Sequence, residues 1–243
     1  MKKLIFTFLM FLTLSLSAQD APVKFLGIPV DGNKKELVAK LKEKGFVYNN
    51  ENKCLNGKFN GNMVDVFFHT NNDNVDRIIV RQSQTIREYD IKVRFNNLVR
   101  QFEKNKKYVS DKNNQYIDDK VDIEYEILVK NKRFQAIYHQ TYTDDELESI
   151  QKYLYDNYDS LISRLVNNED FDLYGLDKYD INFEVGNKDF DKDEIVNKLL
   201  LMIKSKYIEN NNVWFMIDEE SYYGYNILLY YDNLKNVSDG EDL

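Results

Sequence analysis

The sequence is poor in the residues that crosslink or loosen a chain. Among its 243 residues are one cysteine, two prolines and nine glycines. One cysteine, Cys54, cannot form an internal disulfide, so the core alone must hold the fold together, and we expect Cys54 to be a small buried apolar group. Few prolines and glycines, together with 43% hydrophobic and 14% aromatic residues, are typical of a packed globular protein and exclude a disordered linker.

The sequence also has little material for nucleophilic or metal catalysis. Its two histidines, His69 and His139, each end a predicted strand and lack a second ligand at zinc-site spacing. It has no nucleophile elbow, no His-Glu-x-x-His, no phosphate-binding glycine loop and no dinucleotide fingerprint. Acidic runs from Asp170 and Asp189 lack the final glutamate of a calcium loop. We therefore predict no catalytic residue, no cofactor and no metal.

Positive charge is in deficit, with 33 basic against 41 acidic residues and a net charge of −8. A net negative charge repels a phosphate backbone and an anionic lipid surface. Nucleic acid is therefore not expected as a partner. Carboxylates are plentiful, and acid pairs meet only in space, so a carboxylate-based extracellular hydrolase stays open as an alternative.

Residues 1–18 have the layout of a cleavable signal peptide. Lys2 and Lys3 precede an apolar run from Leu4 to Leu16, and the small residues Ser17 and Ala18 follow. The run is too short for a transmembrane anchor, and no cysteine follows it for lipid attachment. We expect an exported protein, periplasmic or extracellular, without a membrane anchor after cleavage.

Hydrophobic periodicity divides the rest of the chain into helices and strands. Asn33, Asp90, Thr143 and Asp191 are predicted to begin helices. Three of them are followed three residues later by a glutamate, Glu36, Glu146 and Glu194, and the Thr143 helix is predicted to run unbroken to about Val166. The apolar run 199–203 in the last helix is expected to be covered on more than one side. Strands are predicted at 23–30, 53–59, 63–70, 75–81, 123–129, 133–140, 179–185, 213–218 and 223–231, with a tight turn at Asn60-Gly61.

This order predicts an α+β fold in which amphipathic helices pack on antiparallel sheet. We expect an α+β domain with an antiparallel meander over 19–142 and, over 143–243, a long helix followed by a β-α-β-β lobe. Similar endings of three helices suggest repeated helix-plus-strands units, and convergence of helices with basic ends explains them equally well.

Tyrosine is abundant, with 18 residues, and many lie close to Trp214 in sequence. Exposed amphipathic rings bind sugars and proteins, whereas in an alternating strand half of them face the core. Trp214, Tyr222, Tyr223 and Tyr225 are the candidate binding residues.

Several short motifs are spread over much of the chain: Phe25-Leu26-Gly27-Ile28-Pro29-Val30-Asp31-Gly32, Gly57-Lys58-Phe59-Asn60-Gly61, Asp90-Ile91-Lys92 with Arg94-Phe95-Asn96, and the ending Gly240-Glu241-Asp242-Leu243. In these motifs the chain resembles a family of exported Bacteroidetes-type proteins of unknown function. The resemblance assigns no residue a role. The order of helix and antiparallel strands is also similar to β-lactamase-inhibitor-protein-like and PepSY-like folds, a likeness of fold alone.

These observations favour a secreted, non-enzymatic binding or inhibitor-like module whose partner is an envelope or extracellular protein or glycan. A structural role in envelope assembly is a further alternative, which predicts co-purification with outer-membrane complexes.

Overall fold

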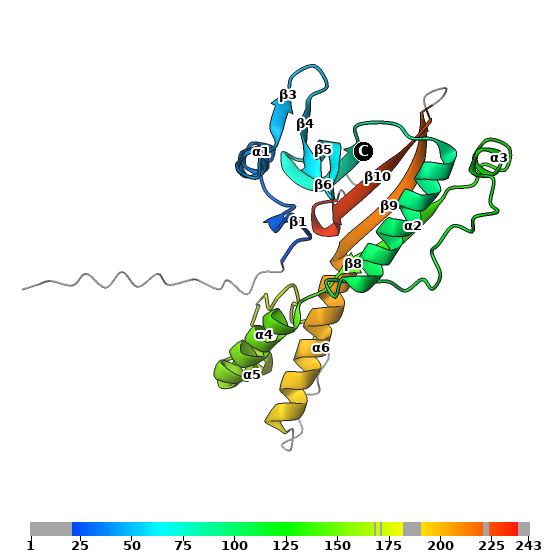
Figure 1. Cartoon of the computed structure of the whole chain (residues 1–243). Coiled ribbons are helices and arrows are strands. Elements are labelled where there is room, and N and C mark those ends of the chain that lie inside the picture. Colours follow the sequence, from blue (N-terminus) through cyan, green and yellow to red (C-terminus); the bar gives the residue numbers. More distant parts are fainter. Residues whose placement is uncertain (1–20, 168, 171, 182–190, 221–223, 238–243) are drawn as a thin grey trace, which may run out of the picture.

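The computed structural model of the chain describes residues 21–167, 169–170, 172–181, 191–220 and 224–237. Within these residues, six α-helices pack against an eight-stranded antiparallel sheet and a small two-stranded sheet, so the fold is α+β as the sequence predicts (Figure 1). The predicted signal peptide lies outside the described residues. None of the described helices has the length and apolar character needed to cross a membrane.

The single extended segment predicted at 23–30 is wrong, because the chain turns back at Leu26 and Gly27, whose φ values are 52° and 80°. The segment forms a hairpin, β1 (Lys24–Phe25) and β2 (Ile28–Pro29), followed by α1 (Lys34–Glu43). The Asn33 side chain accepts a hydrogen bond from the Lys35 N–H at 2.9 Å, which caps the helix as predicted. The predicted meander follows as β3 (Val47–Asn49), β4 (Cys54–Phe59), β5 (Asn62–Asn71) and β6 (Asn74–Gln82). Asn60 and Gly61 have φ of 49° and 77°, the positive values that a tight two-residue hairpin turn requires.

Helix α2 (Glu88–Lys104) covers the middle of the sheet. Its apolar residues at helical spacing are all buried, as predicted: Ile91, Phe95, Leu98, Val99 and Phe102. The N-cap is Arg87 and not Asp90. Asp90 lies instead in the first turn, where its charge is favourable to the helix dipole.

The strand predicted at 123–129 is wrong, because this segment is a short helix, α3 (Ile123–Leu128). The Asp122 carboxylate accepts a hydrogen bond from the Tyr125 N–H at 2.8 Å and begins the helix. The segment is so short that its alternating apolar and acidic residues fit both the two-residue period of a strand and the 3.6-residue period of a helix. The capping hydrogen bond therefore decides the conformation. The strand predicted after it is confirmed as β8 (Gln135–Gln140), which pairs with β7 (Tyr108–Val109).

The helix predicted to run unbroken from Thr143 to Val166 consists of two helices, α4 (Asp144–Asp156) and α5 (Tyr158–Val166). The predicted capping box is present, since Thr143 and Glu146 exchange side-chain-to-backbone hydrogen bonds. At the break, the Asn157 side chain donates to the Tyr153 carbonyl at 2.9 Å. Such a local bond competes with the helical ladder, although the apolar stripe continues through it.

One expectation for the last third needs correction. Residues 178–180 form a turn and not the start of a strand, because the Asp177 carboxylate accepts hydrogen bonds from the Tyr179 and Asp180 N–H groups. Ile181 also belongs to no strand, and residues 182–185 of the predicted strand lie outside the described residues. In α6 (Lys192–Asn210), Leu199 and Ile203 are buried but Leu201 is 65% exposed. Leu200 and Met202 are half-buried against the smaller core, so the run 199–203 is covered at four of its five residues and exposed at Leu201.

Helix α6 leads directly into β9 (Asn211–Glu220), which pairs with β10 (Gly224–Asn233) before a 3₁₀ turn at Leu234–Asn236. The order of strands in the large sheet is β3-β4-β5-β6-β10-β9-β8-β7. The last two strands of the chain thus lie in the middle of the sheet, between β6 and β8. The sheet takes strands from both sides of the boundary predicted at Thr143.

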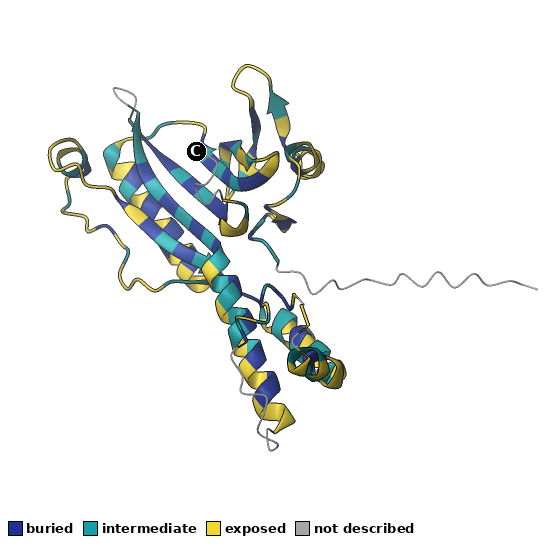
Figure 2. Cartoon of the chain, turned by 180° about the vertical axis from the view of Figure 1, so that it is seen from behind, coloured by how far each residue is buried: buried dark blue, intermediate teal, exposed yellow. Residues whose placement is uncertain are grey.

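The described residues have two hydrophobic cores. The larger lies between one face of the sheet and the segments that cover it, α1, α2 and the N-terminal hairpin. The smaller joins α4, α5 and α6 with the loop around Leu173 and Leu176, and these helices project beyond the end of the sheet (Figure 1). Seen from behind, strands β8–β10 carry alternating buried and half-buried residues, and no described helix lies in front of them (Figure 2). This uncovered side of the sheet is called the open face below.

Candidate functional site

The structure separates the residues that the sequence marks as a binding site. Trp214 lies on β9 with its half-buried ring on the open face. Tyr225, on β10, points the other way: it is 7% exposed and belongs to the larger core. Burial raises the pKa of the Tyr225 phenol to about 12. Tyr222 and Tyr223 lie outside the described residues.

An apolar row crosses five strands of the open face at Trp214. Opposed pairs run from β5 through β6, β10 and β9 to β8, and all five side chains are half-buried: Phe67, Ile79, Tyr230, Trp214 and Ile137. Trp214 and Tyr230 are stacked in its middle, with ring centroids 3.9 Å apart and an angle of 7° between the rings. We call this set of five side chains the aromatic row. It presents an ordered apolar strip on a rigid sheet.

Asp232 holds one side of the aromatic row. Its carboxylate, 5% exposed, accepts a hydrogen bond from the indole N–H of Trp214 at 2.8 Å and two from Arg77, at 2.6 and 3.2 Å. The Arg77 guanidinium lies 5.6 Å from the centre of the Tyr230 ring. The hydrogen bonds to Asp232 raise the pKa of the Arg77 guanidinium above its ordinary value. The Trp214 ring is therefore held by a charge-assisted hydrogen bond, and the Tyr230 ring by stacking on Trp214 and by the Arg77 cation, before any ligand arrives.

A second ion pair holds the other side of the row. The buried carboxylate of Asp65 accepts hydrogen bonds from Arg81 at 2.9 Å and from Asn56 and Ser83, each at 2.7 Å. The Arg81 guanidinium lies 5.3 Å from the centre of the Phe67 ring. Both flanking charges are thus neutralised within the sheet, and the aromatic row lies between two internal ion pairs.

One end of the open face is acidic. Asp218 and Glu220 lie towards the end of β9, and Glu220 is 3.5 Å from Arg81. Burial and, secondly, the nearby charge of Glu220 raise the pKa of Asp218. A partner that places a cation here would relieve the repulsion between the two carboxylates.

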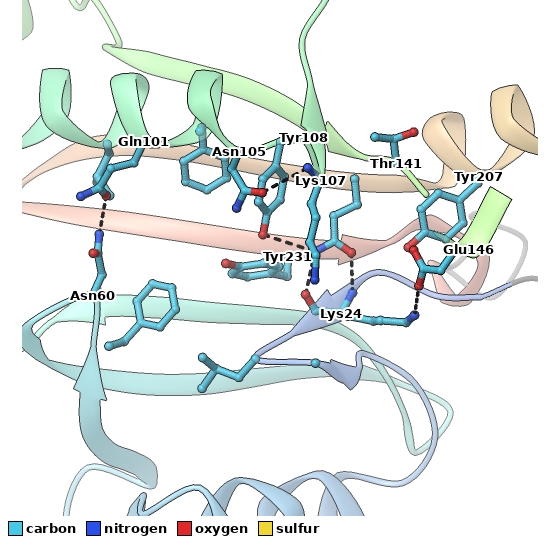
Figure 3. A pocket seen from close by; sticks show the side chains of 16 residues that line it. Lys24, Asn60, Gln101, Asn105, Lys107, Tyr108, Thr141, Glu146, Tyr207 and Tyr231 are labelled. Carbon is cyan, nitrogen blue, oxygen red and sulfur yellow. Dashed lines mark hydrogen bonds and ion pairs between the residues drawn. The ribbon is translucent and has the colours of Figure 1, made fainter. Parts of the chain in front are cut away.

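A larger cavity lies elsewhere, where the N-terminal hairpin meets α2, β8 and α4 (Figure 3). It has a volume of about 590 Å³. Its polar side chains bond mainly to one another: the Gln140 amide exchanges hydrogen bonds with the main chain of Lys24, at 2.7 and 2.8 Å, and Lys24 pairs with Glu146 at 3.2 Å. These contacts fasten the hairpin to the sheet and to α4.

The hydrolase alternative requires two carboxylates in one cleft, and Glu146 is the one carboxylate among the described residues of this cavity. Burial acts to raise the pKa of Glu146, but hydrogen bonds from the Thr143 N–H and hydroxyl and the charge of Lys24 outweigh it, so the pKa is lowered. Glu146 is therefore ionised at neutral pH, which suits a structural ion pair better than a general acid.

The two histidines and the cysteine do not form a group with one another. His69 contacts Asp76 at 2.7 Å with 64% of its side chain exposed, and His139 lies 3.8 Å from Asp111. Cys54 is fully buried, as predicted, and burial raises the pKa of its thiol. Among the described residues, no three histidine, cysteine or acidic side chains are grouped to hold a metal ion.

Comparisons with models of protein families, with curated proteins and with solved structures found no match to this chain.

Sequence reasoning identified Trp214 but missed the residues that make it part of a site. Period-two alternation in β10 places Leu228, Tyr230 and Asp232 on one face, which separates Tyr230 from Tyr225. The pairing of Tyr230 with Trp214, and of Asp232 with Arg77 at a sequence separation of 155, depends on strand order. No local signal carries that information.

Proposed function

We propose that this protein is an exported binding module that holds a folded protein partner against the open face of its sheet, with Trp214 and Tyr230 at the centre of the contact. The observation that carries the proposal is the stacked pair held by Asp232 and Arg77 on a face that no described helix covers. Tryptophan, tyrosine and arginine are the residues enriched where binding energy concentrates.

The shape and charge of the open face favour a protein over other ligands. The aromatic row extends over five strands, and neighbouring strands lie about 4.8 Å apart, so the strip is about 19 Å long and suits an extended contact. A partner that covers the two flanking ion pairs loses little free energy by desolvating them, because the charges within each pair already neutralise each other. The partner that fits has an apolar ridge for the row and a lysine or arginine for the acidic end at Asp218.

The test compares variants of the mature protein as bait. A protein retained from the envelope fraction or culture medium is identified, purified and titrated against each bait. Trp214→Ala is expected to weaken this complex by about 30-fold, since central aromatic anchors contribute about 2 kcal/mol or more. Tyr179→Ala is the matched control, because Tyr179 is 81% exposed and lies in the turn 178–180, outside the sheet.

Equal affinity of the Trp214→Ala and Tyr179→Ala baits would overturn the proposal, provided that circular dichroism shows both to be folded. The protein has one tryptophan, so its fluorescence reports on this face alone. Binding at the aromatic row is expected to shift the emission of Trp214, and a saturating partner that leaves the emission unchanged would count against the site. Self-association through the open face would appear as a change in mass on dilution.

A further inference from the structure

A second candidate site lies on the opposite side of the sheet, between α2 and the turn that joins β4 and β5. The described cavity here has a volume of about 410 Å³, and we call it the α2 groove. Its walls carry side-chain amides from three elements, and Tyr89 and Val93 are exposed at its rim. The amides belong to Asn60 and Asn62 at the turn, Gln82 at the end of β6, and Asn97 and Gln101 on α2.

Arg94 is the one arginine or lysine among the described residues of the α2 groove, and its charge has no internal partner. No described residue forms a hydrogen bond or ion pair with it, and its Nε atom is buried without an acceptor. Arg77 and Arg81, on the other face of the sheet, each pair with a buried aspartate. An unpaired donor out of water costs free energy, and burial lowers the pKa of Arg94 accordingly.

Gln82 has an unpaired hydrogen-bond acceptor, where Arg94 has an unpaired donor. It is 9% exposed, and its Oε1 atom is buried without a donor. Gln82 and Arg94 line the α2 groove and also a small void of about 20 Å³ beneath it, against Val80 and Leu98. An unpaired donor and an unpaired acceptor are therefore buried in the wall between one groove and the core.

The two groups call for a ligand that offers an acceptor and a donor together. In this structure both atoms are closed to solvent, so a ligand bonds to them only when the two side chains turn toward the groove. A carboxylate oxygen then satisfies the Arg94 Nε–H, and a hydroxyl beside it satisfies the Gln82 oxygen. Asn60 and Gln101, which are hydrogen-bonded to each other at 2.7 Å across the groove, leave further amide groups for hydroxyls, and the Tyr89 ring can cover the apolar side of a sugar. Asp90, the acid at the groove, is paired with Arg87.

We propose that the α2 groove binds an acidic sugar of the uronate class, with its carboxylate on Arg94 and a ring hydroxyl on Gln82. The net charge of −8 opposes a ligand with many charges, so the site takes one carboxylate, as a single uronate or the end of a short oligosaccharide. The groove and the open face lie on opposite sides of the sheet, and the two sites are independent.

The probe is D-glucuronate, titrated into the ¹⁵N-labelled mature protein while the Nε–Hε resonance of Arg94 is followed by NMR. Glucose, which lacks the carboxylate, and acetate, which lacks the hydroxyls, are the comparison ligands. Glucuronate is expected to shift the Arg94 resonance downfield and to bind at least about tenfold more tightly than either.

Gln82→Glu is the decisive variant. The new carboxylate supplies Arg94 with an internal acceptor, so the variant is expected to melt no lower than the wild type, while glucuronate affinity falls at least about tenfold. Arg94→Lys keeps the charge but removes Nε and is expected to weaken binding, with Arg133→Lys, at an exposed site outside the groove, as its control. Trp214→Ala should leave glucuronate binding unchanged, which separates this test from that of the open face.

Three outcomes would overturn the proposal. Equal binding of glucose would show that Arg94 takes no part, and equal binding of acetate would show an anion site without sugar selectivity. No shift of the Arg94 resonance at millimolar glucuronate would mean that the sugar does not reach Arg94.

Discussion

Trp214 and Tyr230 face each other across β9 and β10, with ring centroids 3.9 Å apart and planes 7° from parallel. Because the stack and the apolar contact both depend on the second ring, Tyr230→Ala is expected to lower the free energy of unfolding by about 2 kcal/mol. Tyr230→Phe keeps the ring and should cost less than about 1 kcal/mol. Urea unfolding followed by Trp214 fluorescence measures both values, and an equal loss in the two variants would show that the hydroxyl matters more than the stack.

Tyr225 and Tyr179 give a test of core against surface. Tyr225 is 7% exposed in the larger core, whereas Tyr179 is 81% exposed. Tyr225→Ala is expected to destabilise the fold by about 3 kcal/mol through the cavity it leaves, and Tyr179→Ala by less than about 0.5 kcal/mol. Thermal unfolding measures the difference. A Tyr225→Ala protein as stable as the wild type would place this ring on the surface.

Gly57 lies in β4 directly beneath the ring of Phe46, and a side-chain methyl at position 57 would overlap that ring. Gly57→Ala is therefore expected to cost about 2 kcal/mol of stability, since an overpacked core must shift. Phe46→Leu makes room, so the double variant should lose less than the sum of the two single losses. Lys58→Ala, at the exposed neighbour, is the control, and strict additivity in denaturant titrations would argue against the contact.

Glu146 joins α4 to the N-terminal hairpin through its contact with Lys24, and its pKa is lowered. A carboxyl whose pKa is lower in the folded than in the unfolded state stabilises the fold above the unfolded pKa, and this contribution is lost as the pH falls through the folded pKa. Glu146→Gln retains the capping geometry but removes the charge. With 42% of the Glu146 side chain exposed, solvent screening limits the expected loss at neutral pH to about 1 kcal/mol.

The measurement for Glu146 is the stability of both proteins as a function of pH. The difference between wild type and Glu146→Gln should be present at neutral pH and should shrink in acid, where both side chains are uncharged. A difference that stays constant, or that grows in acid, would contradict the assigned direction of the pKa shift.

The sequence predicted helix starts and tight turns correctly where the residues that interact lie within one turn of each other. Asn33, Thr143 and Asp191 begin their helices through side-chain bonds to backbone N–H groups two or three residues away, and Asn60-Gly61 makes its turn through its own φ values. The same locality explains the error at 123–129. Apolar and acidic residues alternate there, but the hydrogen bond from Tyr125 to Asp122 favours a helical turn.

By itself, the sequence determined the α+β class, the buried stripe of α2, the meander and the core position of Cys54, because burial pattern and capping are properties of neighbouring residues. Tertiary structure alone decided that β9 and β10 enter the middle of the sheet, between β6 and β8. That placement stacks Trp214 on Tyr230, pairs Arg77 with Asp232 and turns Tyr225 into the core. It also brings Gln82 and Arg94 to one groove without partners. Contacts between distant segments depend on strand order and register, which a single sequence does not encode in any local pattern.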